Sequence, residues 1–81
     1  MNVVFDTEAL LAFYLGEPGG KKVERCLTRI MKKEIKGYLN IVNLTELYYI
    51  LYRQSPELAE EKERNLRGYG LDIVPVDDNK L

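Results

Sequence analysis

The chain has 81 residues, of which 46% are hydrophobic and 31% charged, and its formal net charge is −1, a composition typical of one small folded domain without a global attraction to nucleic acid. It contains one cysteine and no histidine, which excludes an intrachain disulfide, a cysteine-cluster metal site and any histidine acting as a base or a ligand. No stretch approaches the ~20 apolar residues of a membrane span, and the N-terminus lacks the pattern of a signal peptide, so we expect a cytoplasmic protein.

The hydrophobic patterns predict seven elements in the order strand, helix, helix, strand, helix, helix, strand. They cover residues 2–5, 8–15, 21–33, 38–42 and 43–53, then a helix from Pro56 to Gly68 or Gly70, and residues 71–74. Thr7 can cap the first helix, Ser55 caps the fourth, and Gly37 ends the second.

The alternation of strands with helical crossovers predicts an α/β fold, in which a three-stranded parallel sheet has right-handed connections and is flanked by helices. Pro75 cannot donate to a central ladder, so the third strand should lie at or near a sheet edge. Asp77 and Asp78 are most simply the start of a further helix, and a role in a site is the less common explanation for them.

Two acidic residues stand where a metal site is expected. Asp6 directly follows the first predicted strand, and Glu46 lies in the first turn of the helix that follows the second strand. Because ligands bind at the carboxyl ends of parallel strands, the two carboxylates should face one crevice. They would repel each other there unless one is protonated or a cation lies between them, and Mg²⁺ or Mn²⁺ would fit.

Each candidate residue also has a purely structural explanation. Acidic residues at helix starts commonly cap the helix and complement its dipole. Asn43 and Glu46 have nearly the spacing of a capping box, which on spacing alone is the favoured interpretation, and Thr7 is more often a helix cap than a site hydroxyl. The third helix carries tyrosines that could stack on RNA bases, but core packing or a protein interface is the more common role (Tyr48, Tyr49 and Tyr52).

Three segments resemble blocks of the PIN domain family, in that family's order and at its usual spacing. Residues 4–12 and the loop at 16–19 resemble the opening of the domain, residues 43–49 its second block, and residues 70–77 its third strand. The resemblance extends through essentially all of the chain, and it implies a sheet with the strand order 3-2-1.

PIN domains are typically Mg²⁺- or Mn²⁺-dependent ribonucleases, and many are toxins of VapC-type toxin–antitoxin pairs. The resemblance therefore implies a metal-dependent endoribonuclease with RNA as its substrate and an antitoxin as a protein partner. It maps the family's first acid onto Asp6, the adjacent serine or threonine onto Thr7, and the second acid onto Glu46, which makes Asp6 and Glu46 the metal ligands.

The same resemblance implies an incomplete site. The family's third and fourth acids would lie beyond Leu81, and Asp77 and Asp78 match neither of them. We therefore expect residues 1–81 to form the N-terminal portion of a PIN-like domain with weak or absent Mg²⁺ binding, because Mg²⁺ keeps several waters when protein ligands are few.

The alternative function is that of a non-catalytic, degenerate or truncated PIN module that acts through protein association. In the order 3-2-1 the first strand becomes a sheet edge without proline or charge, which favours a homodimer. A phosphatase of the haloacid-dehalogenase type is a weaker option, because it needs an aspartate two residues after the strand-end aspartate and this chain has Glu8 there.

Overall fold

Seven elements follow one another in the computed structural model, which describes residues 1–75. They are β1 (Asn2–Phe5), α1 (Thr7–Tyr14), α2 (Gly20–Met31), β2 (Lys36–Asn40), α3 (Ile41–Gln54), α4 (Pro56–Arg67) and β3 (Asp72–Val74). All three strands are parallel, and β2 lies between β1 and β3. The predicted α/β fold with the order 3-2-1 is therefore confirmed. The helix start predicted at Asp77 and Asp78 lies outside the described residues.

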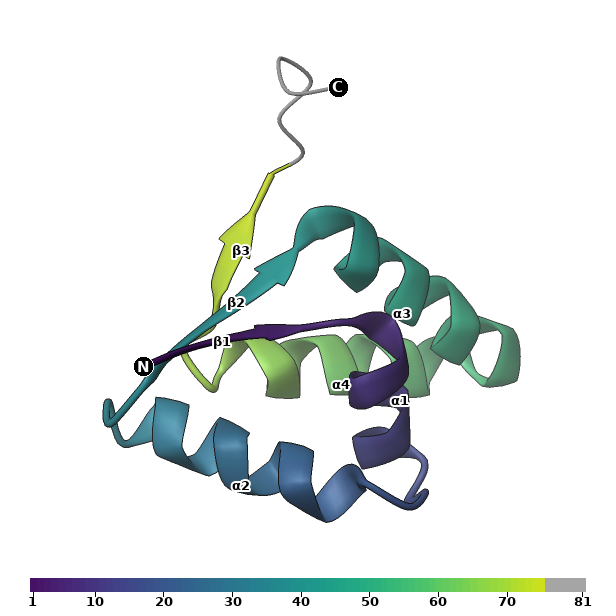
Figure 1. Ribbon diagram of the computed structural model, residues 1–81. Helices are drawn as coiled ribbons and strands as arrows, with labels where there is room; N and C mark the ends of the chain where they lie inside the picture. The colour runs from purple at the N-terminus through teal and green to yellow at the C-terminus, as the bar shows by residue number, and fades with distance from the viewer. Residues whose placement is uncertain (76–81) are drawn as a thin grey trace.

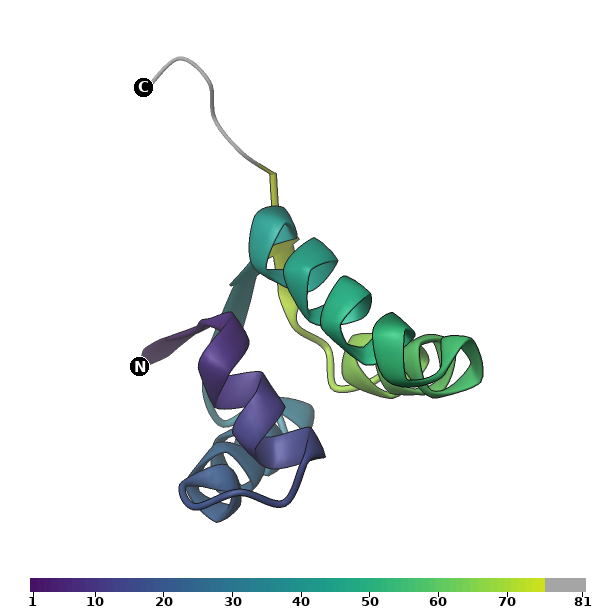
Figure 2. The same ribbon diagram turned by 90° about the vertical axis from the view of Figure 1, so that its right-hand side faces the viewer.

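The four helices cover one face of the sheet. The chain steps in the same direction from β1 to β2 and from β2 to β3, so right-handed crossovers place both helical pairs on the same side. Figures 1 and 2 show this arrangement: α1 and α2 form one pair and α3 and α4 the other, and the side of the sheet turned away from them carries no described element. The carboxyl ends of β1 and β2 lead directly into α1 and α3.

The core lies between the sheet and these helices. Each strand sends alternate side chains toward the helices, and the register aligns Phe5 with Leu39 and Leu39 with Ile73. The buried hydrophobic residues form a single cluster: Phe5, Leu10, Leu27, Ile30, Ile35, Leu39, Leu44, Leu47, Leu51, Ala59, Leu66 and Leu71. The helical spacing of the leucines in the sequence follows from their position on the buried side of each helix.

The boundary between β2 and α3 differs from the prediction. Residues 41 and 42 were expected to end the strand because both are β-branched, but they form the first two residues of α3. The cause is Asn40, whose side-chain Oδ1 accepts a hydrogen bond from the Val42 N–H at 2.7 Å and so caps the helix. The cap overrides the strand propensity of Ile41 and Val42, and α3 starts two residues earlier than expected.

Gly37 has a different role from the predicted one. It does not end α2, which stops at Met31 before Lys33 turns the chain with a φ of 64°. Gly37 lies buried within β2, where an added Cβ would lie 2.6 Å from Cδ2 of Leu71 and would also overlap Ile30. The glycine leaves room for the side chains of Ile30 from α2 and of Leu71, which pack against the backbone of β2 at this point.

Candidate functional site

Asp6 lies at the carboxyl end of β1 and caps α1. One of its carboxylate oxygens, Oδ1, accepts a hydrogen bond from the Ala9 N–H at 2.8 Å, and its backbone is extended, with φ −107° and ψ 172°. The predicted capping role of Thr7 is therefore wrong, because α1 begins at Thr7 itself and the cap is the residue before it. The Asp6 side chain is exposed, and among the described residues its second carboxylate oxygen has no protein partner.

Thr7 is buried and joins α1 to α3. Its hydroxyl lies 3.3 Å from the backbone oxygen of Asn43 and 3.4 Å from Oδ1 of the same residue, so it can donate to either. Asn43 in turn donates from Nδ2 to the Phe5 carbonyl at 3.5 Å. Asn43 thus links the last residue of β1, the first residue of α1 and the first turn of α3.

Sequence reasoning missed this role of Asn43, which it treated as a helix cap. The signal that could have found it is the helical spacing of Asn43 with Leu47 and Leu51, which are both buried. An amide on the buried stripe of a helix needs a hydrogen-bonding partner inside the protein. The structure shows that the partners are Thr7 and the end of β1.

Glu46 is exposed in the second turn of α3, as the sixth residue of that helix. The capping-box interpretation is wrong, because Asn40 rather than Asn43 is the cap and the first turn of α3 contains no acidic residue. In an α-helix, Glu46 lies ~4.5 Å along the axis from Asn43 and ~60° around it. Asn43 contacts Thr7, and Glu46 lies nearly one helical turn further along α3.

The arrangement offers oxygen donors to a hard cation. Carboxylates of this kind suit Mg²⁺ or Mn²⁺ better than softer metals. Within residues 1–75, however, no group of three or more acidic, cysteine or histidine side chains is close enough to hold a metal ion. A cation held here by described side chains would have at most two such ligands and would keep much of its water. Asp77 and Asp78 lie outside the described residues.

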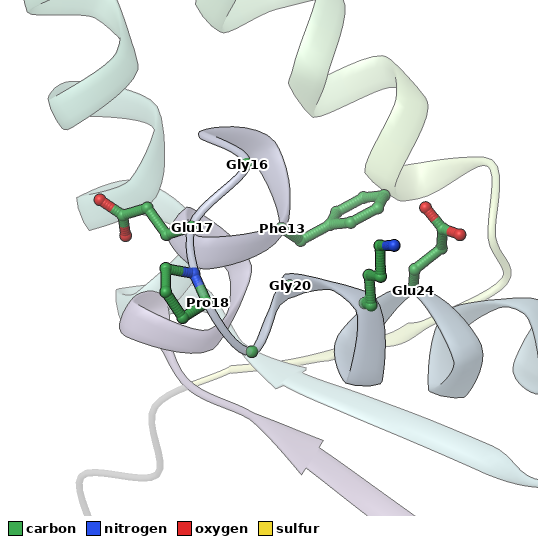
Figure 3. A pocket seen from close by; sticks show the side chains of 8 residues that line it. Phe13, Gly16, Glu17, Pro18, Gly20 and Glu24 are labelled. Atoms are coloured by element: carbon green, nitrogen blue, oxygen red, sulfur yellow. The ribbon is translucent and has the colours of Figure 1, made fainter.

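The cavity of about 500 Å³ shown in Figure 3 lies elsewhere. It is formed by the loop at residues 16–20 with Phe13, Lys21 and Glu24, at the opposite end of α1 from Asp6. An eight-residue helix is ~12 Å long, so the cavity and the strand-end carboxylates are separate features. Asp6 and Glu46 are both exposed, so the candidate site lies on the surface of the described part of the chain.

The tyrosines of α3 form a cluster on its outer side. The ring centroid of Tyr48 lies 5.8 Å from that of Tyr52 and 6.3 Å from that of Tyr49, and both neighbours are exposed. Partial burial and the nearby Glu60 and Glu63 carboxylates raise the pKa of Tyr48 above its ordinary value. The charges beside this cluster are mixed, because Glu63 pairs with Arg67 at 3.1 Å, so the predicted role in an interface or the core stays a prediction.

Comparisons with known proteins identify a family. The family model described as "PIN domain" matches residues 3–81. The comparison with curated proteins gave no significant match. No helix within the described part of the chain is both long and apolar enough to cross a membrane.

Proposed function

Because the chain belongs to the PIN domain family, a family of nucleases, we propose that it acts as a metal-dependent endoribonuclease with Asp6 and Glu46 as its metal ligands. The observation that carries the proposal is the junction of Asp6–Thr7 with α3 at the carboxyl ends of β1 and β2. Ligands of open α/β sheets bind at such ends. An open surface is also more compatible with a polymeric substrate than with a small molecule that must be enclosed.

Three residues share the work in this proposal. Asp6 keeps one oxygen on the Ala9 N–H, which fixes the carboxylate while the other oxygen is free for a cation. Glu46 supplies the second carboxylate from α3. Thr7 is a positioning residue, since its buried hydroxyl holds Asn43 and thereby sets the place of α3 relative to Asp6.

A bound Mg²⁺ or Mn²⁺ would supply an acidified water and a positive charge beside the scissile phosphate. The side chains themselves contribute binding and orientation. With two protein carboxylates we expect weak affinity for Mg²⁺ and somewhat better affinity for Mn²⁺, in line with the general order of divalent-ion affinities.

The test is cleavage of an unstructured RNA by the purified chain in the presence of Mn²⁺ or Mg²⁺. We expect cleavage by the wild type that both Asp6→Asn and Glu46→Gln abolish. The matched control is Glu61→Gln, which removes an exposed acidic group from α4 and should leave the rate unchanged. Equal activity in the wild type and Asp6→Asn would refute the proposal.

The finer part of the proposal is the role of toxin in a toxin–antitoxin pair, with an antitoxin as the protein partner. It is supported by the resemblance of residues 4–12 and 43–49 to the PIN family, many members of which are such toxins. Induced expression should arrest growth of a bacterial host for the wild type and spare it for Asp6→Asn. Arrest by both would assign the toxicity to something other than the strand-end carboxylates.

The alternative is a non-catalytic module that acts through association. It is favoured by a specific observation, the lack within residues 1–75 of any third acidic group near Asp6 and Glu46. In that case RNA would remain intact at every Mn²⁺ concentration while the chain still formed a stable complex with a protein partner. RNA cleavage that depends on Asp6 would exclude this alternative.

A further inference from the structure

Helix α2 and the turn after it carry most of the positive charge of the chain. Residues 20–36 contain seven of its twelve lysines and arginines and two of its thirteen acidic residues, so this segment has a net charge of +5 in a chain whose total is −1. All seven of these basic side chains are exposed. The positive charge is therefore a local feature of the surface, although the chain as a whole is slightly acidic.

Five of these basic residues form a continuous row along one side of α2. They are Lys21, Lys22, Arg25, Arg29 and Lys32, which we call the basic stripe. At ~100° per residue they fall within one sector of ~100°, and they extend ~17 Å along the helix axis. Leu27 and Ile30 point the other way, into the core, and Glu24, the only acidic residue of α2, lies outside the sector. Figure 1 shows no described element beyond α2 on the side turned away from the sheet.

The basic stripe is electrostatically unfavourable for the helix that carries it. Lys21 and Arg25 are four residues apart, as are Arg25 and Arg29, and like charges at this spacing destabilise a helix. Lys21 and Lys22 also lie in the first turn, where the helix dipole disfavours cations and no acidic residue balances them. Among the described residues the stripe has one ion pair, in which Nε of Arg29 lies 3.3 Å from Oε1 of Glu34. A negatively charged partner would relieve these repulsions.

The residue types of the stripe distinguish among negatively charged partners. A membrane surface would need an apolar helix face to insert, but the apolar face of α2 is buried in the core. A protein interface ordinarily has an apolar centre and is poor in lysine, whereas three of the five stripe residues are lysines and none is apolar. A phosphate backbone requires no apolar contact, because lysine and arginine bind it through charge and the release of counterions. The stripe therefore fits a phosphate polymer best.

We propose that the basic stripe of α2 binds the phosphate backbone of an RNA strand, at a surface separate from the candidate site. The choice of RNA rests on the proposed function, whereas the contact itself needs neither a divalent ion nor the strand-end carboxylates. The contact is independent of base sequence, because phosphates carry no sequence information and the stripe has no aromatic side chain on which bases could stack.

The number of charges sets the expected affinity. Five basic residues, one of them shared with Glu34, would neutralise about four phosphates, and the affinity for a single strand falls with salt at a logarithmic slope of about −0.7 per phosphate. We therefore expect a total slope of about −3 and a dissociation constant of about 1–100 μM at physiological salt.

The experiment is a titration of a labelled oligouridine strand with the intact chain, followed by fluorescence anisotropy at several salt concentrations. It is done in EDTA, so that no metal-dependent cleavage occurs. Lys22→Gln combined with Arg25→Gln removes two phosphate contacts, so the slope should become shallower by about 1.4, which corresponds to about 25-fold weaker binding at 0.1 M salt relative to 1 M. The corresponding DNA strand should bind about as well as the RNA, because the 2′-hydroxyl plays no part in the contact.

The matched control is Arg53→Gln combined with Arg64→Gln. It removes two exposed positive charges from α3 and α4 and should leave the slope and the dissociation constant unchanged. Far-UV circular dichroism should show the wild-type helix content in both double variants, because glutamine is a good helix former.

Several results would overturn the proposal. They are a lack of RNA binding at about 0.1 mM chain in low salt, equal losses of affinity in the two double variants, and an RNA preference over DNA of more than about tenfold. Tighter binding of polyglutamate than of RNA would also overturn it, and would assign the stripe to an acidic protein partner. Binding of RNA through the stripe in EDTA without any cleavage in Mn²⁺ would support this proposal and count against the nuclease activity alone.

Discussion

Substitution of Asp6 separates the capping of α1 from metal binding. Asp6→Ala removes the acceptor of the Ala9 N–H, a hydrogen bond of 2.8 Å, and should lower the free energy of unfolding by about 1 kcal/mol. For a domain of this size that loss corresponds to a decrease of about 4–8 °C in the melting temperature. Asp6→Asn should have little effect on stability, because asparagine caps helices about as well as aspartate.

Both Asp6 variants should lose the stabilisation by Mn²⁺ that we expect for the wild type. A ligand that binds only the folded state raises its stability by RT ln(1 + [L]/Kd), so the urea midpoint of the wild type should increase with Mn²⁺ concentration. Both Asp6→Ala and Asp6→Asn remove one of two carboxylates, and the increase should largely disappear in each. The matched control is Asp72→Asn, an exposed aspartate on the opposite face of the sheet from the helices, which should keep the wild-type response.

Either of two results would refute this reasoning. Equal destabilisation by Asp6→Asn and Asp6→Ala would mean that the negative charge rather than the hydrogen bond stabilises α1. Alternatively, an unchanged Mn²⁺ response in Asp6→Asn would show that Asp6 is only a helix cap. In the second case the nuclease proposal would lose its first metal ligand.

Three further predictions concern the fold around the site. Gly37→Ala places a Cβ 2.6 Å from Cδ2 of Leu71 and against the Ile30 side chain, and it should cost about 1–3 kcal/mol of stability in a urea titration. A smaller change would show that the Leu71 and Ile30 side chains can move aside. Burial raises the pKa of Tyr14 above its ordinary value of 10.0, so the folded state favours the neutral phenol. This preference contributes fully to the stability of the fold below pH 10, and the contribution is lost as the pH rises through the raised pKa. Tyr14→Phe should therefore flatten the decline of thermal stability in alkaline solution. Thr7→Val removes the hydroxyl that bonds Asn43 and should cost about 1 kcal/mol, with a double-mutant cycle to Asn43→Ala showing a non-additive effect.

The sequence by itself determined the fold class and the order of elements. Short aliphatic strands, helical spacing of leucines and the Ser55–Pro56 start of α4 are local signals, and each acts over a few residues. The resemblance to the PIN family, which the match over residues 3–81 confirms, fixed the strand order that the structure shows. Asp6 was found because it directly follows a strand.

Other features were decided by tertiary contacts. The start of α3 moved to Ile41 because the Asn40 cap prevailed over β-branched propensity, and this shift removed the capping explanation for Glu46. Gly37 lies inside β2 and leaves room there for the side chains of Ile30 and Leu71, a requirement that only the packed structure shows. Asn43 and Thr7 are 36 residues apart, and their contact depends on how two helices meet at the ends of two strands. The direction of both crossovers likewise placed all four described helices on one face of the sheet, because handedness acts on the assembled sheet and not on any single segment.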